Sequence, residues 1–198
     1  MVAPPTVHDT AIVADDVELG EGAVIGPWAL LGVDGPPEAP PLQLGPGAIV
    51  RSHAVLYRGS TFGSGLHVSH GALVREATEV GDHVSIGSHT IVEHHVQIGH
   101  GVRLHSNCFV PEHSVLGAGC WLGPNVVVTN ARYPNRPDTK DHLEGVQVGE
   151  GAVIGAGSVL LPGVRIGERA LVGAGAVVVR DVLADAVIVG NPGREVQR

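Results

Sequence analysis

The chain of 198 residues is long enough for one domain with a substantial core, and its formal net charge of −8 argues against non-specific binding to nucleic acid or to an anionic membrane. It contains 29 glycines and 14 prolines but only two residues each of Phe, Trp and Tyr, so the core must consist mainly of Val, Ile, Leu and Ala. Two cysteines exclude a disulfide framework, and no signal peptide or long apolar span is recognisable, so we expect a cytoplasmic protein.

The predicted elements follow a period of six residues. An apolar residue recurs at every sixth position through 7–31, 44–128 and 148–178, and the fourth residue after it is nearly always small or β-branched. This period is neither helical nor a simple alternation, and it is typical of a parallel β-helix with short strands and tight turns. The sequence therefore predicts an all-β hexapeptide-repeat solenoid over one domain, 1–198.

The period is interrupted twice and then ends. Segments 32–43 and 129–147 break the six-residue step, so we expect two extended loops there, and 184–198 is expected to be a short C-terminal tail. Both cysteines, Cys108 and Cys120, fall on the small position of a hexad. A buried spacer role is therefore favoured over a nucleophile for each.

One glycine column predicts a coil of three hexads. Every eighteenth residue is glycine at Gly45, Gly63, Gly81, Gly99 and Gly117, whereas the other two columns at this hexad position are mixed. We interpret this column as one corner of a three-sided prism. The backbone conformation at this corner is expected to be the same in every coil and to be one that only glycine can form.

The hexads resemble those of the hexapeptide-repeat acyltransferase superfamily, with nucleotide-amino-sugar N-acetyltransferases as the nearest relatives. The resemblance implies a left-handed parallel β-helix, a homotrimer with active sites between subunits, and acetyl transfer from acetyl-CoA to the amine of a nucleotide-linked amino sugar. No metal is expected for this reaction.

Two histidines are candidate bases by this resemblance. The segment "IVEHHVQIG" (91–99) is similar to the His-acidic segment that carries the general base in bacillosamine-type N-acetyltransferases and lipid A acyltransferases, which implies that His94 is the base. His95 stands where that family has an acid, and stacked Glu76 and Glu112 are candidate orienters. The segment "HSN" (105–107) implies instead that His105 is the base and that Asn107 lies near the acceptor amine, with glycines leaving open space around His105.

The same resemblance implies two binding regions. "WLGPNVVVTNARYP" (121–134) is similar to the segment that ends the active-site coil of the sugar N-acetyltransferases, so Asn130, Arg132 and Tyr133 are candidate acceptor contacts. "LVGAGAVVVRDV…VIVGNPGREV" (171–196) resembles the last coil and the Gly-Asn-Pro tail of the family. Small residues that stack in the coils after the second loop are expected to border pantetheine, and an arginine is expected to meet the CoA phosphates. The cofactor candidates are Gly155, Ala156, Gly173, Ala174 and Arg180.

Other functions remain open at this point. "IGHGVRLH" has the His-x4-His spacing of γ-class carbonic anhydrases, for which the zinc ligands would be His83, His100 and His105. Tyr133 stands where maltose and galactoside O-acetyltransferases carry their catalytic histidine, which argues against that O-acetyl mechanism without excluding O-acylation. A non-catalytic scaffold subunit is the third alternative. The sequence identifies neither the acceptor, nor the acyl chain length, nor the role of 32–43.

Overall fold

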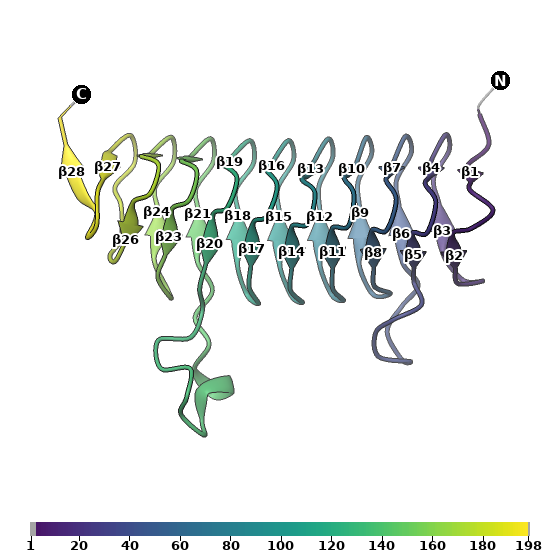
Figure 1. The fold of residues 1–198 in the computed structure, drawn as a ribbon, viewed down its shortest axis with the longest axis horizontal. Coiled ribbons are helices and arrows are strands. Elements are labelled where there is room, and N and C mark those ends of the chain that lie inside the picture. The colour runs from purple at the N-terminus through teal and green to yellow at the C-terminus, as the bar shows by residue number, and fades with distance from the viewer. Residues whose placement is uncertain (1–2, 198) are drawn as a thin grey trace.

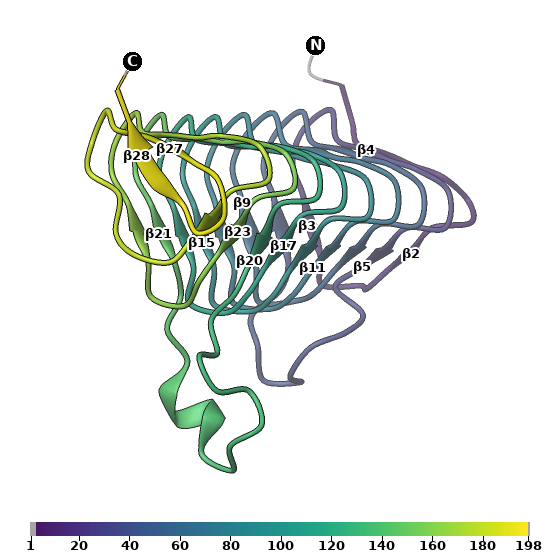
Figure 2. The same cartoon turned by 60° about the vertical axis from the view of Figure 1, so that its left-hand side comes forward.

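A computed structural model describes residues 3–197; Met1, Val2 and Arg198, which the expected domain and tail include, lie outside the described residues. The chain winds into a parallel β-solenoid of about 10 turns (Figure 1). Three sheets of 11, 9 and 8 strands form its walls, so the coil is triangular in cross-section (Figure 2). The predicted fold class is confirmed, and this architecture is consistent with a left-handed β-helix.

The strands of each sheet follow one another along the solenoid axis. Sheet A contains β1 (Thr6–Val7), β4 (Val24–Ile25), β7 (Ile49–Val50), β10 (His67–Val68), β13 (Ser85–Ile86), β16 (Arg103–Leu104), β19 (Trp121–Leu122), β22 (Val153–Ile154), β25 (Leu171–Val172), β27 (Val187–Val189) and β28 (Arg194–Val196). Sheet B contains β2 (Ile12–Val13), β5 (Leu30–Leu31), β8 (Val55–Leu56), β11 (Leu73–Val74), β14 (Ile91–Val92), β17 (Phe109–Val110), β20 (Val127–Val128), β23 (Val159–Leu160) and β26 (Val177–Val178). Sheet C contains β3 (Glu18–Leu19), β6 (Gln43–Leu44), β9 (Thr61–Phe62), β12 (Glu79–Val80), β15 (Gln97–Ile98), β18 (Val115–Leu116), β21 (Gln147–Val148) and β24 (Arg165–Ile166).

Each hexad supplies one two-residue strand and one corner. The second strand residue points inward, as Val68, Ile86 and Leu104 show with at most 1% exposure. Neighbouring coils pair in parallel with an offset of 18 residues, for example His67 with Ser85. Apolar side chains therefore stack inside the prism, and their burial supplies the main driving force for folding.

The corners account for the placement of five of the 12 histidines. The third residue after each inward strand residue commonly has a positive φ, a left-handed conformation in which Gly, Asn and His are enriched. Of the 12 histidines, these corner positions hold His53, His83, His89, His95 and His113, with φ between 56° and 65°. Asn107 occupies the same kind of position with φ 60°, so its backbone conformation alone favours asparagine there.

The glycine column has a different cause from the one expected. Gly45, Gly63, Gly81, Gly99 and Gly117 are not among the residues with positive φ. A Cβ on Gly99 would instead lie 2.7 Å from the backbone nitrogen of Ala118 in the next coil. These glycines allow two coils to approach each other closely, and the interpretation as glycine-only turns was wrong.

Both long connections leave the solenoid after a strand of sheet B (Figures 1 and 2). The first joins β5 to β6, and the second joins β20 to β21 and contains the 3-10 helix η1 (Thr139–His142). Gln43 and Gln147, expected at the ends of the loops, are already the first residues of β6 and β21. The expected tail contains β27 and β28, which pair as antiparallel strands. Within residues 3–197, no helix has the length and hydropathy required to cross a membrane.

Candidate functional site

The candidate residues occupy the three edges of the prism. We name each edge after the two sheets whose consecutive strands it joins. Residues 105–108 lie on corner AB, residues 93–96 lie on corner BC, and residues 99–102 lie on corner CA. Corner AB holds His105, Asn107, Gly155, Ala156, Gly173 and Ala174. Corner BC holds His94, Asn130, the long loop with Arg132 and Tyr133, and Arg180. Corner CA holds His83 and His100.

A polar cluster lies on corner BC where the long loop begins. Nδ2 of Asn130 donates a hydrogen bond to Oε2 of Glu112 at 2.7 Å, and Nε2 of His94 lies 3.6 Å from Oε1 of the same carboxyl group. The side chains of His94 and Glu112 are 26% and 23% exposed. The 18-residue stacking thus brings a candidate base, its expected orienter and a candidate acceptor contact together, as the sequence predicted for His94 and Glu112.

Glu112 is held in its ionised form. Partial burial of this carboxyl group opposes ionisation, but its own backbone amide, the Asn130 amide and the nearby His94 and His113 together lower its pKa below the ordinary value. Glu76, the other expected orienter of His94, is bound instead by the guanidinium of Arg75 at 2.9 Å. The structure therefore supports Glu112, and not Glu76, as the carboxylate that faces His94.

His95 adds a second imidazole to this cluster. Nδ1 of His95 lies 2.7 Å from Nδ1 of His94, and the two rings meet edge to face with their centroids 4.9 Å apart. The ring of His113, one coil further on, lies 5.8 Å from that of His95. His95 and His113 are exposed, whereas His94 is half-buried between them and Glu112.

His105 has a different environment on corner AB. Its ring packs edge to face on Trp121 with a centroid distance of 4.7 Å. The expected open space beside it is therefore occupied by this indole, which also lies 3.0 Å from where a Cβ on Gly123 would be. Unlike His94, His105 has a stacking surface, and no ion pair with a carboxylate is found for it among the described residues.

The expected acyl-carrier residues form an open column on corner AB. Ala156 and Ala174 are exposed, and a Cβ added at Gly157 or Gly175 would meet no described atom within 4 Å. The backbone of this column is accessible to a thin, extended ligand such as pantetheine. Arg180 follows β26 on corner BC and does not join this column within one chain.

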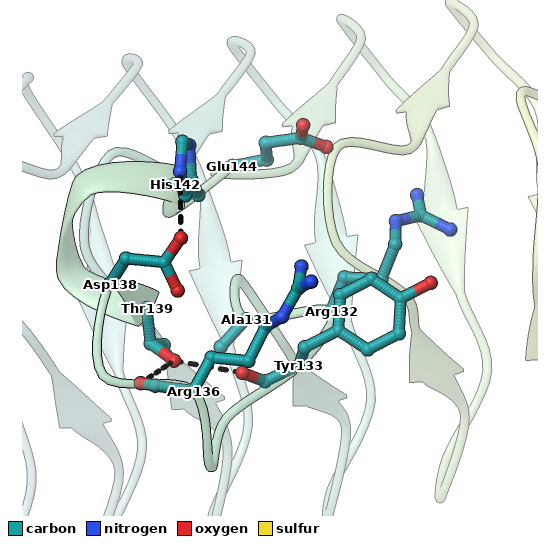
Figure 3. Close-up of a pocket in the computed structure, with 8 residues that line it drawn as sticks. All are labelled: Ala131, Arg132, Tyr133, Arg136, Asp138, Thr139, His142 and Glu144. Atoms are coloured by element: carbon teal, nitrogen blue, oxygen red, sulfur yellow. Dashed lines mark hydrogen bonds and ion pairs between the residues drawn. The ribbon is translucent and has the colours of Figure 1, made fainter.

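The long loop forms a pocket of about 260 Å³ (Figure 3). Oγ1 of Thr139 lies 2.8 and 2.7 Å from the carbonyl oxygens of Tyr133 and Arg136, which share its single hydroxyl hydrogen, and this contact closes the loop on itself. The guanidinium of Arg136 lies 5.0 Å from the centre of the Tyr133 ring. The pocket is lined by Ala131, Arg132, Tyr133, Arg136, Asp138, Thr139, His142 and Glu144. Sequence reasoning missed Arg136, although a second arginine three residues after Tyr133 in a polar loop was a usable signal.

The alternative zinc ligands do not share a site within one chain. His83 and His100 lie on corner CA, whereas His105 lies on corner AB. Nδ1 of His100 is 3.2 Å from Oδ2 of Asp82. Over residues 3–197, no group of three or more His, Cys, Asp or Glu side chains is arranged to hold a metal ion.

The cysteines occupy the interior as predicted. Cys108 and Cys120 are 2% and 0% exposed. Burial raises the pKa of Cys120 to about 12, and burial also raises the pKa of Cys108 despite hydrogen bonds that lower it. Neutral, enclosed thiols of this kind pack as small apolar groups and are poor nucleophiles.

A family model described as "Bacterial transferase hexapeptide (six repeats)" matches residues 77–112 and 145–180. None of the curated proteins matches the chain. Among solved structures, the UDP-N-acetylglucosamine acyltransferase of Arabidopsis is 19% identical with a TM-score of 0.65, covering 96% of this chain and 73% of that chain.

Two bacterial structures are similar to a comparable degree. The UDP-N-acetylglucosamine acyltransferase of Francisella novicida is 14% identical with a TM-score of 0.59, covering 98% of this chain and 68% of that chain. The UDP-N-acetylglucosamine O-acyltransferase of Moraxella catarrhalis is 16% identical with a TM-score of 0.53, covering 96% and 73%. At these identities the likeness establishes a shared fold.

Proposed function

We propose that this hexapeptide-repeat protein is an acyltransferase that moves an acetyl group from acetyl-CoA to the amine of a nucleotide-linked amino sugar. The observation that carries the proposal is the cluster of His94, Glu112 and Asn130 at the start of the long loop. An acyl transfer to an amine requires a group that removes a proton during attack on the thioester, and the histidines of a cluster that contains an ionised carboxylate suit that role.

Corner BC is the better supported of the two candidate base positions. His94 faces the carboxylate of Glu112 at 3.6 Å, whereas the ring of His105 stacks on Trp121. His105 and Asn107 lie instead on the corner that carries the acyl-carrier column, where they are suited to contact the thioester end of acetyl-CoA. The loop pocket, with Arg132, Arg136 and Tyr133, suits a phosphate-bearing acceptor.

The proposed enzyme is a homotrimer, because the acyl-carrier column and the base lie on different corners of one chain. Sheet B separates these corners, and the outward residue of each of its strands is apolar: Ile12, Leu30, Val55, Leu73, Ile91, Phe109, Val127, Val159 and Val177. Sheet C presents mainly polar residues at the corresponding positions: Glu18, Gln43, Thr61, Glu79, Gln97, Val115, Gln147 and Arg165. An interface through sheet B buries apolar surface and brings a partner next to both corners.

The proposal is tested by incubating the purified protein with acetyl-CoA and a panel of nucleotide-linked amino sugars, together with their hydroxyl analogues. Free CoA thiol and the acetylated product are measured, the latter by mass spectrometry. We expect acetylation of at least one amine and slower or no reaction with its hydroxyl analogue. Failure to bind acetyl-CoA, measured by calorimetry, would reject the proposal and favour a scaffold subunit.

A further inference from the structure

The hydrogen bond between the two adjacent histidines of corner BC determines where their protons reside. Nδ1 of His94 and Nδ1 of His95 are 2.7 Å apart, so one of these nitrogens carries the hydrogen and the other accepts it. The remaining nitrogen of His94, Nε2, faces Oε1 of Glu112 at 3.6 Å. A lone pair on Nε2 would be repelled by this anionic oxygen, whereas an N–H is attracted to it. Neutral His94 therefore carries its proton on Nε2 and accepts through Nδ1.

With the hydrogen bond in this direction, the nitrogen that can accept a proton from a substrate is Nε2 of His95. Since Nδ1 of His94 accepts, Nδ1 of His95 must donate, and Nε2 of His95 then bears an unshared lone pair. His95 is exposed at the outer end of the cluster, while His94 is half-buried. We propose that His95 is the catalytic base of the acetyl transfer and that His94 and Glu112 are positioning residues that act through it. This inference rests on the proposed function.

The proton balance of the reaction fits this arrangement. The acceptor nitrogen attacks the thioester carbonyl carbon, and its proton passes to Nε2 of His95. When the tetrahedral intermediate collapses, the carbon–sulfur bond breaks, and the thiolate of CoA takes the proton back from Nε2. The products are the amide and the free thiol, and His95 returns to its initial form.

The contacts of His95 are compatible with a transient proton on Nε2. Nδ1 of protonated His95 still donates to His94, and Nε2 of His94 faces the ionised Glu112. The backbone amide of His95 donates to the carbonyl oxygen of Glu76 at 3.3 Å, whose carboxylate is bound by Arg75. The His113 ring also lies close to His95, at 5.8 Å between ring centroids.

The proton positions can be measured without any substrate. In protein labelled with ¹⁵N-histidine, two-bond proton–nitrogen correlations distinguish the two neutral tautomers of each imidazole. Above the histidine titration range we expect the Nε2–H form for His94 and the Nδ1–H form for His95, with signals assigned from single variants. The variant His94→Phe removes the acceptor and should release His95 from the Nδ1–H form. An Nε2–H form of His95 in the wild-type protein overturns the inference.

Kinetics test the catalytic role with a matched control. Asparagine tolerates the left-handed backbone of both His95 (φ 56°) and His53 (φ 60°), so His95→Asn and His53→Asn change the imidazole and keep the corner. With acetyl-CoA and the best amine of the panel, we expect His95→Asn to lower kcat by about 10²–10⁴-fold with little change in the KM for acetyl-CoA. Added imidazole should restore part of the rate, and His53→Asn should behave as wild type.

The possible results distinguish the proposed acetyl-transfer function from the catalytic role of His95. Near wild-type kcat in His95→Asn refutes the catalytic role of His95 even if the enzyme acetylates amines. A wild-type protein that transfers no acetyl group refutes the proposed function and with it that role, while the tautomers still decide the hydrogen-bond order. A rate loss in His95→Asn that imidazole does not restore, with an altered KM for acetyl-CoA, assigns a structural role instead.

Discussion

The side-chain amide of Asn130 donates a 2.7 Å hydrogen bond to the carboxylate of Glu112, one coil earlier on the same corner. The long loop leaves the solenoid at this residue, so its first turn is tied to the carboxylate that faces His94. The position of the loop and the orientation of the cluster are therefore coupled through one side chain.

Glu112 should make stability depend on pH. Because its folded-state pKa is lowered, its ionised form contributes stability above the unfolded pKa of about 4.3, and this contribution is lost as the pH falls through the folded-state value. We expect Glu112→Gln to be less stable than wild type at pH 7 and the difference to shrink towards pH 3. Urea unfolding at a series of pH values measures it, with the exposed Glu79→Gln as control. A difference that is constant with pH contradicts the expectation.

The two glycine positions of a corner should respond differently to alanine. A Cβ at Gly99 would meet the backbone of the next coil at 2.7 Å, whereas Gly101 has φ 67° and open space around it. Gly101→Ala should cost about 1–2 kcal/mol through its left-handed backbone. Gly99→Ala should cost about 3 kcal/mol or more, because the coils must move apart. Denaturant unfolding compares them, and equal losses would argue against close approach as the cause.

The apolar face of sheet B should govern assembly. Val127 on sheet B and Val115 on sheet C are 38% and 37% exposed, so the two Val→Glu substitutions are matched in residue type and exposure. We expect a trimer for wild type and Val115→Glu, and dissociation for Val127→Glu, because the added charge lies in the proposed interface. Sedimentation equilibrium measures the mass. A monomeric wild type, or a trimeric Val127→Glu, would exclude sheet B as the contact.

The acyl-carrier column can be blocked selectively. The tripeptide Gly-Ala-Gly occurs at 173–175 on corner AB and again at 117–119 on corner CA. Ala174→Phe places a large side chain over the column and should weaken acetyl-CoA binding at least about tenfold, while Ala118→Phe should not. Calorimetric titration with acetyl-CoA measures both affinities. Equal affinities would show that the thioester does not follow corner AB.

The six-residue period was sufficient to predict the repeat, the residues that point inward and the two loops that interrupt the repeat. Inward positions such as Leu104 and small positions such as Cys108 repeat in sequence because each occupies the same place in every coil. The hexapeptide repeat itself is confirmed by the family model that matches residues 77–112 and 145–180, since the pattern that defines the fold is local and regular.

The chemistry of the corners was harder to predict. The sequence does not say which residues have a positive φ, so the corner roles of His83, His89 and Asn107 became visible only in the structure. The stacking of Glu112 next to His94 followed from the 18-residue spacing, but the bond between His94 and His95 depends on their rotamers. Likewise, the Tyr133–Arg136 contact depends on the path of a loop that has no repeat.

The antiparallel pairing of β28 with β27 has a consequence at the end of the solenoid. Every other strand pair of sheet A is parallel, so an identical chain approaching this end would need a parallel edge on which to continue. It meets instead a reversed strand that carries the exposed charges of Arg194 and Glu195. Strand direction and charge together oppose end-to-end growth into fibrils, a hazard inherent in any repetitive β-structure with an open terminus.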